Sequence, residues 1–131
     1  MSFLNKMFGT ENSKKEEKNR LNWKTLASET DLNAAIDASN NKNIILFKHS
    51  TRCSISSMAK SRLERGWNIS EAEADIYYLD LIQYRSVSNA IAANLDVVHQ
   101  SPQVIVVRNG KAIYDASHSA IDAQSIKASL A

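Results

Sequence analysis

The chain has 131 residues, enough for one compact domain with its own hydrophobic core and too few for two comfortable ones. Hydrophobic residues make up 44% of it and charged residues 23%, a balance that is ordinary for globular proteins and excludes a fibrous or wholly disordered chain. The formal net charge of +2 predicts no attraction to nucleic acid or to acidic membranes.

The first 20 residues differ in pattern from the rest of the chain. Residues 10–20 are rich in charge and have no apolar periodicity, so we interpret 1–20 as a partly flexible segment ahead of a domain at 21–131. Apolar side chains within 1–8 could instead fold back as a short helix. The start has no secretory signal, and no segment approaches the ~18 apolar residues of a membrane span. A lone cysteine also suits a reducing compartment, so we expect a cytoplasmic protein.

The predicted domain begins with a short extended piece, a helix and a strand. Residues 23–26 form the extended piece, and Ser28 and Asp31 have the spacing of a capping box that starts the helix. The run NIILF at 43–47 is apolar and bounded by polar residues. It is typical of a strand that is buried on both faces in a parallel sheet.

Two further helices enclose a second strand. One helix begins at about Cys53 and ends at Gly66, and its inward-facing residues are predicted to be Ile55, Met58, Ala59 and Leu63. The run at 75–81 is aromatic and aliphatic, which indicates a second buried strand. A helix with Ser86 as its N-cap follows, and its apolar stripe comprises Val87, Ala90, Ile91 and Leu95.

The last elements are a hairpin and a helix. Two apolar runs are joined by Asn109 and Gly110, a pair that strongly indicates a two-residue hairpin turn. Ser119 and Asp122 have capping-box spacing ahead of the final helix. Strand-helix-strand units impose parallel pairing and the hairpin adds an antiparallel edge. The sequence therefore predicts an α/β fold with a mixed central sheet and helices on both faces.

Cys53 is the only cysteine, and it lies where the first buried strand turns into a helix. Open sheets of this kind bind ligands at the carboxyl ends of their strands. If the helix begins at Cys53, unpaired N–H groups and the positive end of the helix dipole favour a thiolate there. Lys48, His49 and Arg52 add positive charge nearby, and Ser56 is placed to donate a hydrogen bond to the sulfur. The alternatives are a buried, inert cysteine and a serine that satisfies backbone donors; the polar flanks favour a reactive thiol.

The remaining polar residues predict no metal site. Each histidine stands alone and no second cysteine completes a ligand set, so we expect surface or loop positions for His49, His99 and His118. Asp80 ends the second strand and could accept a proton from the thiol, although an ordinary strand-end carboxylate is favoured. Pro102 opens a strand, and a cis bond before it is not favoured from composition, because only about 5 to 6% of X-Pro bonds are cis.

The order of elements over the predicted domain resembles the thioredoxin fold, and the segments FKHSTRCSIS and HQSPQVIVVRNGKAIYDASH resemble the monothiol bacilliredoxins of the bacillithiol system. This resemblance implies that Cys53 is the nucleophile and that Ser56 stands where dithiol relatives have a resolving cysteine. It implies that Pro102 is the cis-proline facing the active site, and that Ser101 offers its backbone to an extended substrate. Ser54 stands where the family motif often has proline, which leaves one more N–H near the sulfur.

The function implied by the resemblance is a monothiol thiol-disulfide oxidoreductase. Through Cys53 it would remove a low-molecular-weight thiol, bacillithiol or a similar one, from mixed disulfides on proteins under oxidative stress. The supporting and substrate-binding residues are expected to be Arg52, Ser54, Ser56, Ser101 and Pro102. We expect no bound cofactor. The expected partners are S-thiolated proteins and the small thiol, and we expect no binding to nucleic acid or to a membrane. The oligomeric state is not predicted. Two alternatives remain: a non-catalytic thioredoxin-like binding module, and a redox sensor in a stress response.

Overall fold

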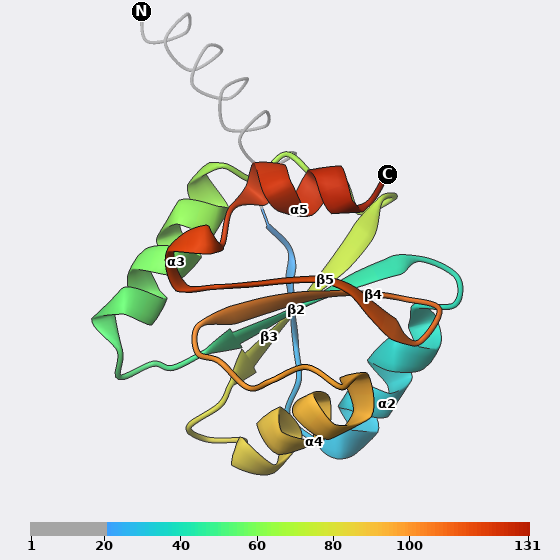
Figure 1. The fold of residues 1–131 in the computed structure, drawn as a ribbon, viewed down its shortest axis with the longest axis horizontal. Helices are drawn as coiled ribbons and strands as arrows, with labels where there is room; N and C mark the ends of the chain where they lie inside the picture. The colour runs from blue at the N-terminus through green and yellow to red at the C-terminus, as the bar shows by residue number, and fades with distance from the viewer. Residues whose placement is uncertain (1–20) are drawn as a thin grey trace, which may run out of the picture.

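The computed structural model describes residues 21–131, so the expectations for residues 1–20, and with them the predicted domain boundary, lie outside what it tests. Its elements, in chain order, are β1 (Trp23–Thr25), α2 (Glu29–Ala38), β2 (Asn43–His49), α3 (Ser54–Arg65), β3 (Ala74–Asp80), α4 (Arg85–Leu95), β4 (Gln103–Arg108), β5 (Lys111–Ser117), the 3-10 helix η1 (His118–Ala120) and α5 (Ala123–Ser129). The strands form one sheet in the order β1-β3-β2-β4-β5. Helices cover both of its faces (Figure 1), which confirms the predicted α/β class with a mixed sheet.

Strand β2 occupies the centre of the sheet. It pairs in parallel with β3, which also pairs in parallel with β1, and it pairs antiparallel with β4. Strands β4 and β5 form the antiparallel edge. The piece at 23–26 is thus a true strand, which the sequence indicates only as an extended segment. Because β2 is central, the loop that follows its carboxyl end lies between the neighbouring strands β3 and β4.

The side chains of β2 alternate between two hydrophobic cores. Every residue of this strand except Asn43 is buried, and the strand extends two residues beyond the predicted run, to Lys48 and His49. Ile45 and Phe47 belong to the core under α3 and α5, where Figure 1 shows these two helices on one side of the sheet. Ile44 and Leu46 belong to the core under α2 and α4 on the other side. Successive strand residues face opposite sides, so Lys48 faces the second core and His49 the first.

Turn and cap chemistry fixes the ends of several elements as predicted. Ser28 is the N-cap of α2, and its hydroxyl oxygen accepts a hydrogen bond from the Asp31 N–H at 3.0 Å. Asn109 and Gly110 have φ values of 52° and 76°, as a tight hairpin turn between β4 and β5 requires. Gly66 is the C-cap of α3. None of the helices described in residues 21–131 has the length and apolar character that crossing a bilayer requires.

The predicted inward face of α3 is wrong by about one residue. Ile55 and Met58 are exposed, with 58% and 65% of their surface accessible. The buried residues of this helix are Ser56, Ala59 and Leu63. Ser56 faces inward because its hydroxyl has a hydrogen-bond partner on β2, which rotates the helix away from the face that hydrophobicity alone favours.

Two other predicted caps differ from the structure. The N-cap of α4 lies two residues earlier than expected, at Tyr84 and not at Ser86. Ser119 lies in the 3-10 helix η1 and does not form a capping box with Asp122. Asp122 is itself the N-cap of α5, and its carboxylate accepts a hydrogen bond from the Ser125 N–H at 3.1 Å. Both errors arise because the sequence offers candidate capping residues but does not show where the preceding turn ends.

Candidate active site

Cys53 lies at the first turn after the central strand, as the N-cap of α3. Its backbone is extended, with φ −106° and ψ 121°, and no side-chain hydrogen bond caps the helix at this end. The Cys53 N–H donates to the Ser50 carbonyl at 3.1 Å, which closes a four-residue turn. The residue is partly exposed. The thiol thus stands at a helix N-terminus whose first N–H groups have no side-chain partner, an arrangement that favours an anion.

Ser101 and Pro102 lie beside this turn. Gln103 of β4 pairs with Lys48 of β2, so the two residues before Gln103 lie along the chain that leads from β2 to Cys53. The Ser101-Pro102 bond is cis, in line with the family resemblance and not with the composition-based expectation. Pro102 is buried, and its carbonyl accepts from the His118 N–H at 3.1 Å. None of the hydrogen bonds among the described residues uses the Ser101 N–H or carbonyl, so both are free to pair with an extended chain.

Ser56 is fully buried and is held by two hydrogen bonds. Its Oγ accepts from the Ser50 N–H at 3.0 Å and lies 2.6 Å from Nδ1 of His49. No hydrogen bond within residues 21–131 joins Ser56 to the Cys53 sulfur. The predicted direct donation to the sulfur is therefore absent from this structure, and the hydroxyl instead connects the helix to β2.

His49 is a buried residue in a strand, not the surface or loop residue that the sequence suggests. Only 5% of its surface is exposed. Burial lowers the pKa of His49, and Lys60 lowers it further, whereas the carboxylates of Asp80 and Glu64 oppose the effect. The imidazole therefore stays neutral near pH 7. The apolar run before His49 hinted at burial, but its partner Ser56 could not be inferred from sequence spacing.

A second polar cluster lies on the opposite face of β2. Lys48 has no exposed surface, and its Nζ lies 3.0 Å from Nδ1 of His99. The buried Ser88 hydroxyl lies 3.4 Å from the same nitrogen. Gln103 donates from Nε2 to the Val98 carbonyl at 3.1 Å. These contacts tie the segment between α4 and β4, which ends at the cis bond, to the central strand.

The other predicted supporting residues are on the surface. Arg52 and Ser54 are both exposed beside Cys53. No hydrogen bond or ion pair among the described residues involves the Arg52 guanidinium, so any effect on the sulfur acts through its charge. Asp80 accepts from the Ile82 N–H at 3.1 Å, as an ordinary strand-end carboxylate does. Within residues 21–131, no three histidine, cysteine or acidic side chains are grouped as metal ligands would be.

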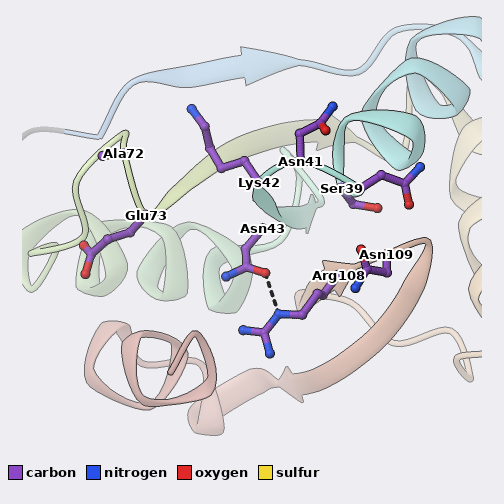
Figure 2. A pocket seen from close by; sticks show the side chains of 9 residues that line it. Ser39, Asn41, Lys42, Asn43, Ala72, Glu73, Arg108 and Asn109 are labelled. Atoms are coloured by element: carbon purple, nitrogen blue, oxygen red, sulfur yellow. Dashed lines mark hydrogen bonds between the residues drawn. The ribbon is translucent and has the colours of Figure 1, made fainter.

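A polar hollow at the other end of the sheet is separate from this site. It measures about 310 Å³, and Figure 2 shows Asn43 and Arg108 among the side chains that line it, joined by a 2.8 Å hydrogen bond from Arg108 Nε. It opens at the amino end of β2, whereas Cys53 follows the carboxyl end. Six steps of extended strand, roughly 20 Å at ~3.3 Å each, separate the two.

Comparisons with known proteins agree with this geometry. A family model described as "Monothiol bacilliredoxin BrxC" matches residues 24–126. A solved structure with a thioredoxin fold, assigned provisionally to the oxidoreductases, is 30% identical; the match covers 82% of this chain and 92% of that one, with a TM-score of 0.71. The thioredoxin of Malassezia sympodialis is 13% identical over 86% and 90% of the two chains, with a TM-score of 0.66. The thioredoxin of Fasciola hepatica is 16% identical over 82% and 95%, with a TM-score of 0.55. The fold is therefore thioredoxin-like, as predicted.

Proposed function

The chain belongs to the monothiol bacilliredoxin family, and on that premise we propose that it removes a small thiol from mixed disulfides on proteins through Cys53. The family and the fold support a redox function of the thiol. The observation that carries the finer proposal is the placement of the only cysteine, partly exposed at an uncapped helix N-terminus beside the free backbone of Ser101.

The proposed reaction has two exchange steps at Cys53. First, the Cys53 thiolate attacks the small-thiol sulfur of the mixed disulfide, so that the protein thiolate leaves with the electrons of the broken bond and takes a proton from water. The small thiol is then disulfide-bonded to Cys53. Second, the thiolate of another small thiol attacks that adduct, which releases the Cys53 thiolate and a small-molecule disulfide. No resident cofactor takes part, and the small thiol, bacillithiol or a similar one, is the co-substrate.

The chain's own residues have distinct tasks in this reaction. The free N–H groups of the first turn of α3 stabilise the Cys53 thiolate as attacking and leaving group, and the exposed charge of Arg52 adds to this attraction. Ser101 binds the substrate chain by strand-like pairing next to the buried Pro102. A serine at position 56 leaves the adduct without an internal resolving thiol, so the second step depends on an external one.

Intact mass spectrometry of a transfer reaction tests this proposal. A carrier protein with one cysteine is loaded with bacillithiol, glutathione or cysteine as a mixed disulfide and mixed with this chain. We expect the small thiol to leave the carrier and to appear on Cys53, and the rate to fall to background with Cys53→Ser. Equal rates with and without Cys53 would reject the reaction. An adduct that no small thiol discharges would reject turnover and support a sensor.

A further inference from the structure

A chain of three hydrogen bonds links His49 to the backbone of Cys53. Nδ1 of His49 lies 2.6 Å from Ser56 Oγ, and that oxygen accepts from the Ser50 N–H at 3.0 Å. The Ser50 carbonyl in turn accepts from the Cys53 N–H at 3.1 Å. The end of β2, the turn and the first turn of α3 are therefore connected by one chain of hydrogen bonds that ends at the Cys53 backbone.

The donors in this chain follow from the chemistry of each group. The Ser50 N–H can only donate, so Ser56 Oγ must accept that bond. Burial lowers the pKa of His49, so we assign a neutral imidazole whose Nδ1 accepts the Ser56 hydroxyl hydrogen and whose proton is on Nε2. Among the described residues, no buried side-chain nitrogen or oxygen lacks a partner. In this assignment the Ser56 hydroxyl donates to Nδ1 of His49 and accepts from the Ser50 N–H.

Aromatic side chains hold the His49 ring in place. The Phe47 ring is stacked on it with centroids 5.8 Å apart and an interplanar angle of 22°, and the Tyr78 ring lies 5.4 Å away. The charged groups that face His49 are Lys60 and Glu64 of α3 and Asp80 of β3. A ring so enclosed cannot swing away from Ser56 without disturbing the core, so Nδ1 is a fixed acceptor.

We propose that His49 is a positioning residue for thiol exchange, acting through Ser56 to hold the turn that presents the Cys53 sulfur. The inference rests on the proposed function, because exchange requires the attacking sulfur to approach a disulfide in line with its bond, and a loosened turn lowers the fraction of time in that geometry. His49 does not touch substrate. Its protonation would convert Nδ1 into a donor and leave the Ser56 hydrogen without its acceptor.

The rate of disulfide exchange by the full chain with a chromogenic aromatic disulfide tests this role. Ser56→Ala and His49→Leu are each expected to slow the reaction of Cys53 by about three- to tenfold, the effect of one net hydrogen bond. Because both act on one chain of bonds, the double variant should be no slower than the slower single variant. His49→Asn places an amide oxygen near the position of Nδ1 and is expected to keep the rate within about twofold of wild type.

A destabilised control separates positioning from folding. Gly110→Ala lies in the hairpin turn at the far end of the sheet, so it lowers stability without touching the hydrogen-bond chain between His49 and Cys53. It should leave the exchange rate unchanged. In Ser56→Ala, amide hydrogen exchange at Ser50 should accelerate by at least about tenfold, and this variant keeps the test valid if His49→Leu does not fold.

The outcomes distinguish this inference from the proposed function. If wild type exchanges no faster than a free small thiol, the proposed function fails and the positioning role fails with it. If wild type is fast but Ser56→Ala and His49→Leu match it, the positioning role alone is overturned. If Gly110→Ala slows exchange as much as Ser56→Ala and His49→Leu do, the hydrogen-bond chain only stabilises the fold. A slow His49→Asn variant would likewise refute the acceptor role of Nδ1.

Discussion

Nζ of Lys48, a side chain with no exposed surface, lies 3.0 Å from Nδ1 of His99, so the central strand is joined to the segment that leads into Pro102. Burial lowers the pKa of Lys48 to about 8 from its ordinary 10.5. Near pH 7 the ammonium donates to a neutral imidazole. A charged group is thus kept in a hydrophobic core at a cost in stability, in exchange for a defined position of the segment beside the thiol.

Replacing Lys48 with Met should stabilise the protein at neutral pH. Below pH 8 the lysine is charged in both the folded and the unfolded states, so wild type carries the full cost of burying the charge. That cost disappears as the pH rises from about 8 to 10.5, because the unfolded state then binds more protons than the folded one. We expect Lys48→Met to raise the free energy of unfolding by about 1 to 3 kcal/mol at pH 7. Urea unfolding at pH 7 and at pH 10.5 measures it.

The same variant tests the link to His99. At pH 10.5 the difference from wild type should shrink to less than about 1 kcal/mol, because the buried lysine is then neutral. His99→Leu, which removes the hydrogen-bond acceptor but keeps Lys48, should be less stable than wild type at pH 7. A Lys48→Met variant that is less stable than wild type at pH 7 would show that the hydrogen bond outweighs the cost of burial.

Acid should destabilise the fold through two histidines. Burial is the main cause that lowers the pKa of both His49 and His99 from the ordinary 6.5, and nearby cations, Lys60 for the first and Lys48 for the second, lower it further. Their stability contribution is present above pH 6.5 and is lost as the pH falls through the lowered folded-state values, because the unfolded state then binds protons that the folded state does not. The free energy of unfolding should therefore fall as the pH drops below 6.5.

Variants identify the groups responsible for that slope. His49→Asn should give a flatter dependence of unfolding free energy on pH below 6.5 than wild type. His118→Asn is the matched control: His118 is exposed, and Asn tolerates its φ of 55°. Equal slopes in wild type and His49→Asn would mean that the buried imidazole takes no part in acid destabilisation.

Much of the fold could be predicted because its signals are local. The apolar run at 43–47, the Asn109-Gly110 pair and the cap at Ser28 each specify an element within a few residues, and all three are observed. Strand β1 was harder to predict because three residues give no periodicity, and its partner β3 lies about 50 positions further along the chain. The position of Cys53 at a strand-to-helix turn followed from the same local patterns.

The polar partners of the site could not be predicted, because they depend on rotation and long-range contact. Ser56 is buried only because α3 turns that face toward His49, and a helical pattern with apolar side chains on two faces does not fix this rotation. Lys48 and His99 are 51 residues apart in sequence. No spacing rule connects a residue of β2 with the loop that follows α4, so only the assembled fold brings them together.

Gly110→Ala should destabilise the fold without altering the thiol. The φ of 76° at Gly110 lies in the left-handed region that a Cβ disfavours, although open space surrounds the position. The substitution should lower the free energy of unfolding by about 1 kcal/mol. Denaturant unfolding measures this, and the rate of Cys53 alkylation serves as the second readout. A stability equal to wild type would show that the turn relaxes at no cost.

Two exposed apolar side chains on α3 should contribute to protein substrates and not to small ones. Ile55 and Met58 lie within the first turns after Cys53 with more than half of their surface exposed. Replacing both with Ser should slow removal of the small thiol from a carrier protein by about threefold or more, because apolar contact area is lost. Exchange with a small disulfide should not change. Ile113→Ser, on the edge strand β5, is the control that should affect neither rate. If the double Ser variant of Ile55 and Met58 slows both reactions equally, these side chains do not contact the protein substrate specifically.

Ser54→Pro should make the fold more stable and the thiol less reactive. Ser54 is the first helical residue of α3, where proline is favoured, and the extended backbone of Cys53 at φ −106° and ψ 121° is what a residue before proline adopts. We expect a gain of about 0.5 to 1 kcal/mol in the free energy of unfolding. The lost N–H is one of the free donors beside the sulfur, so alkylation by iodoacetamide near pH 7 should slow by about two- to threefold. Ser54→Ala removes the hydroxyl but keeps the N–H, so it should match wild type; if it slows alkylation as much as Ser54→Pro does, the hydroxyl and not the backbone donor stabilises the anion.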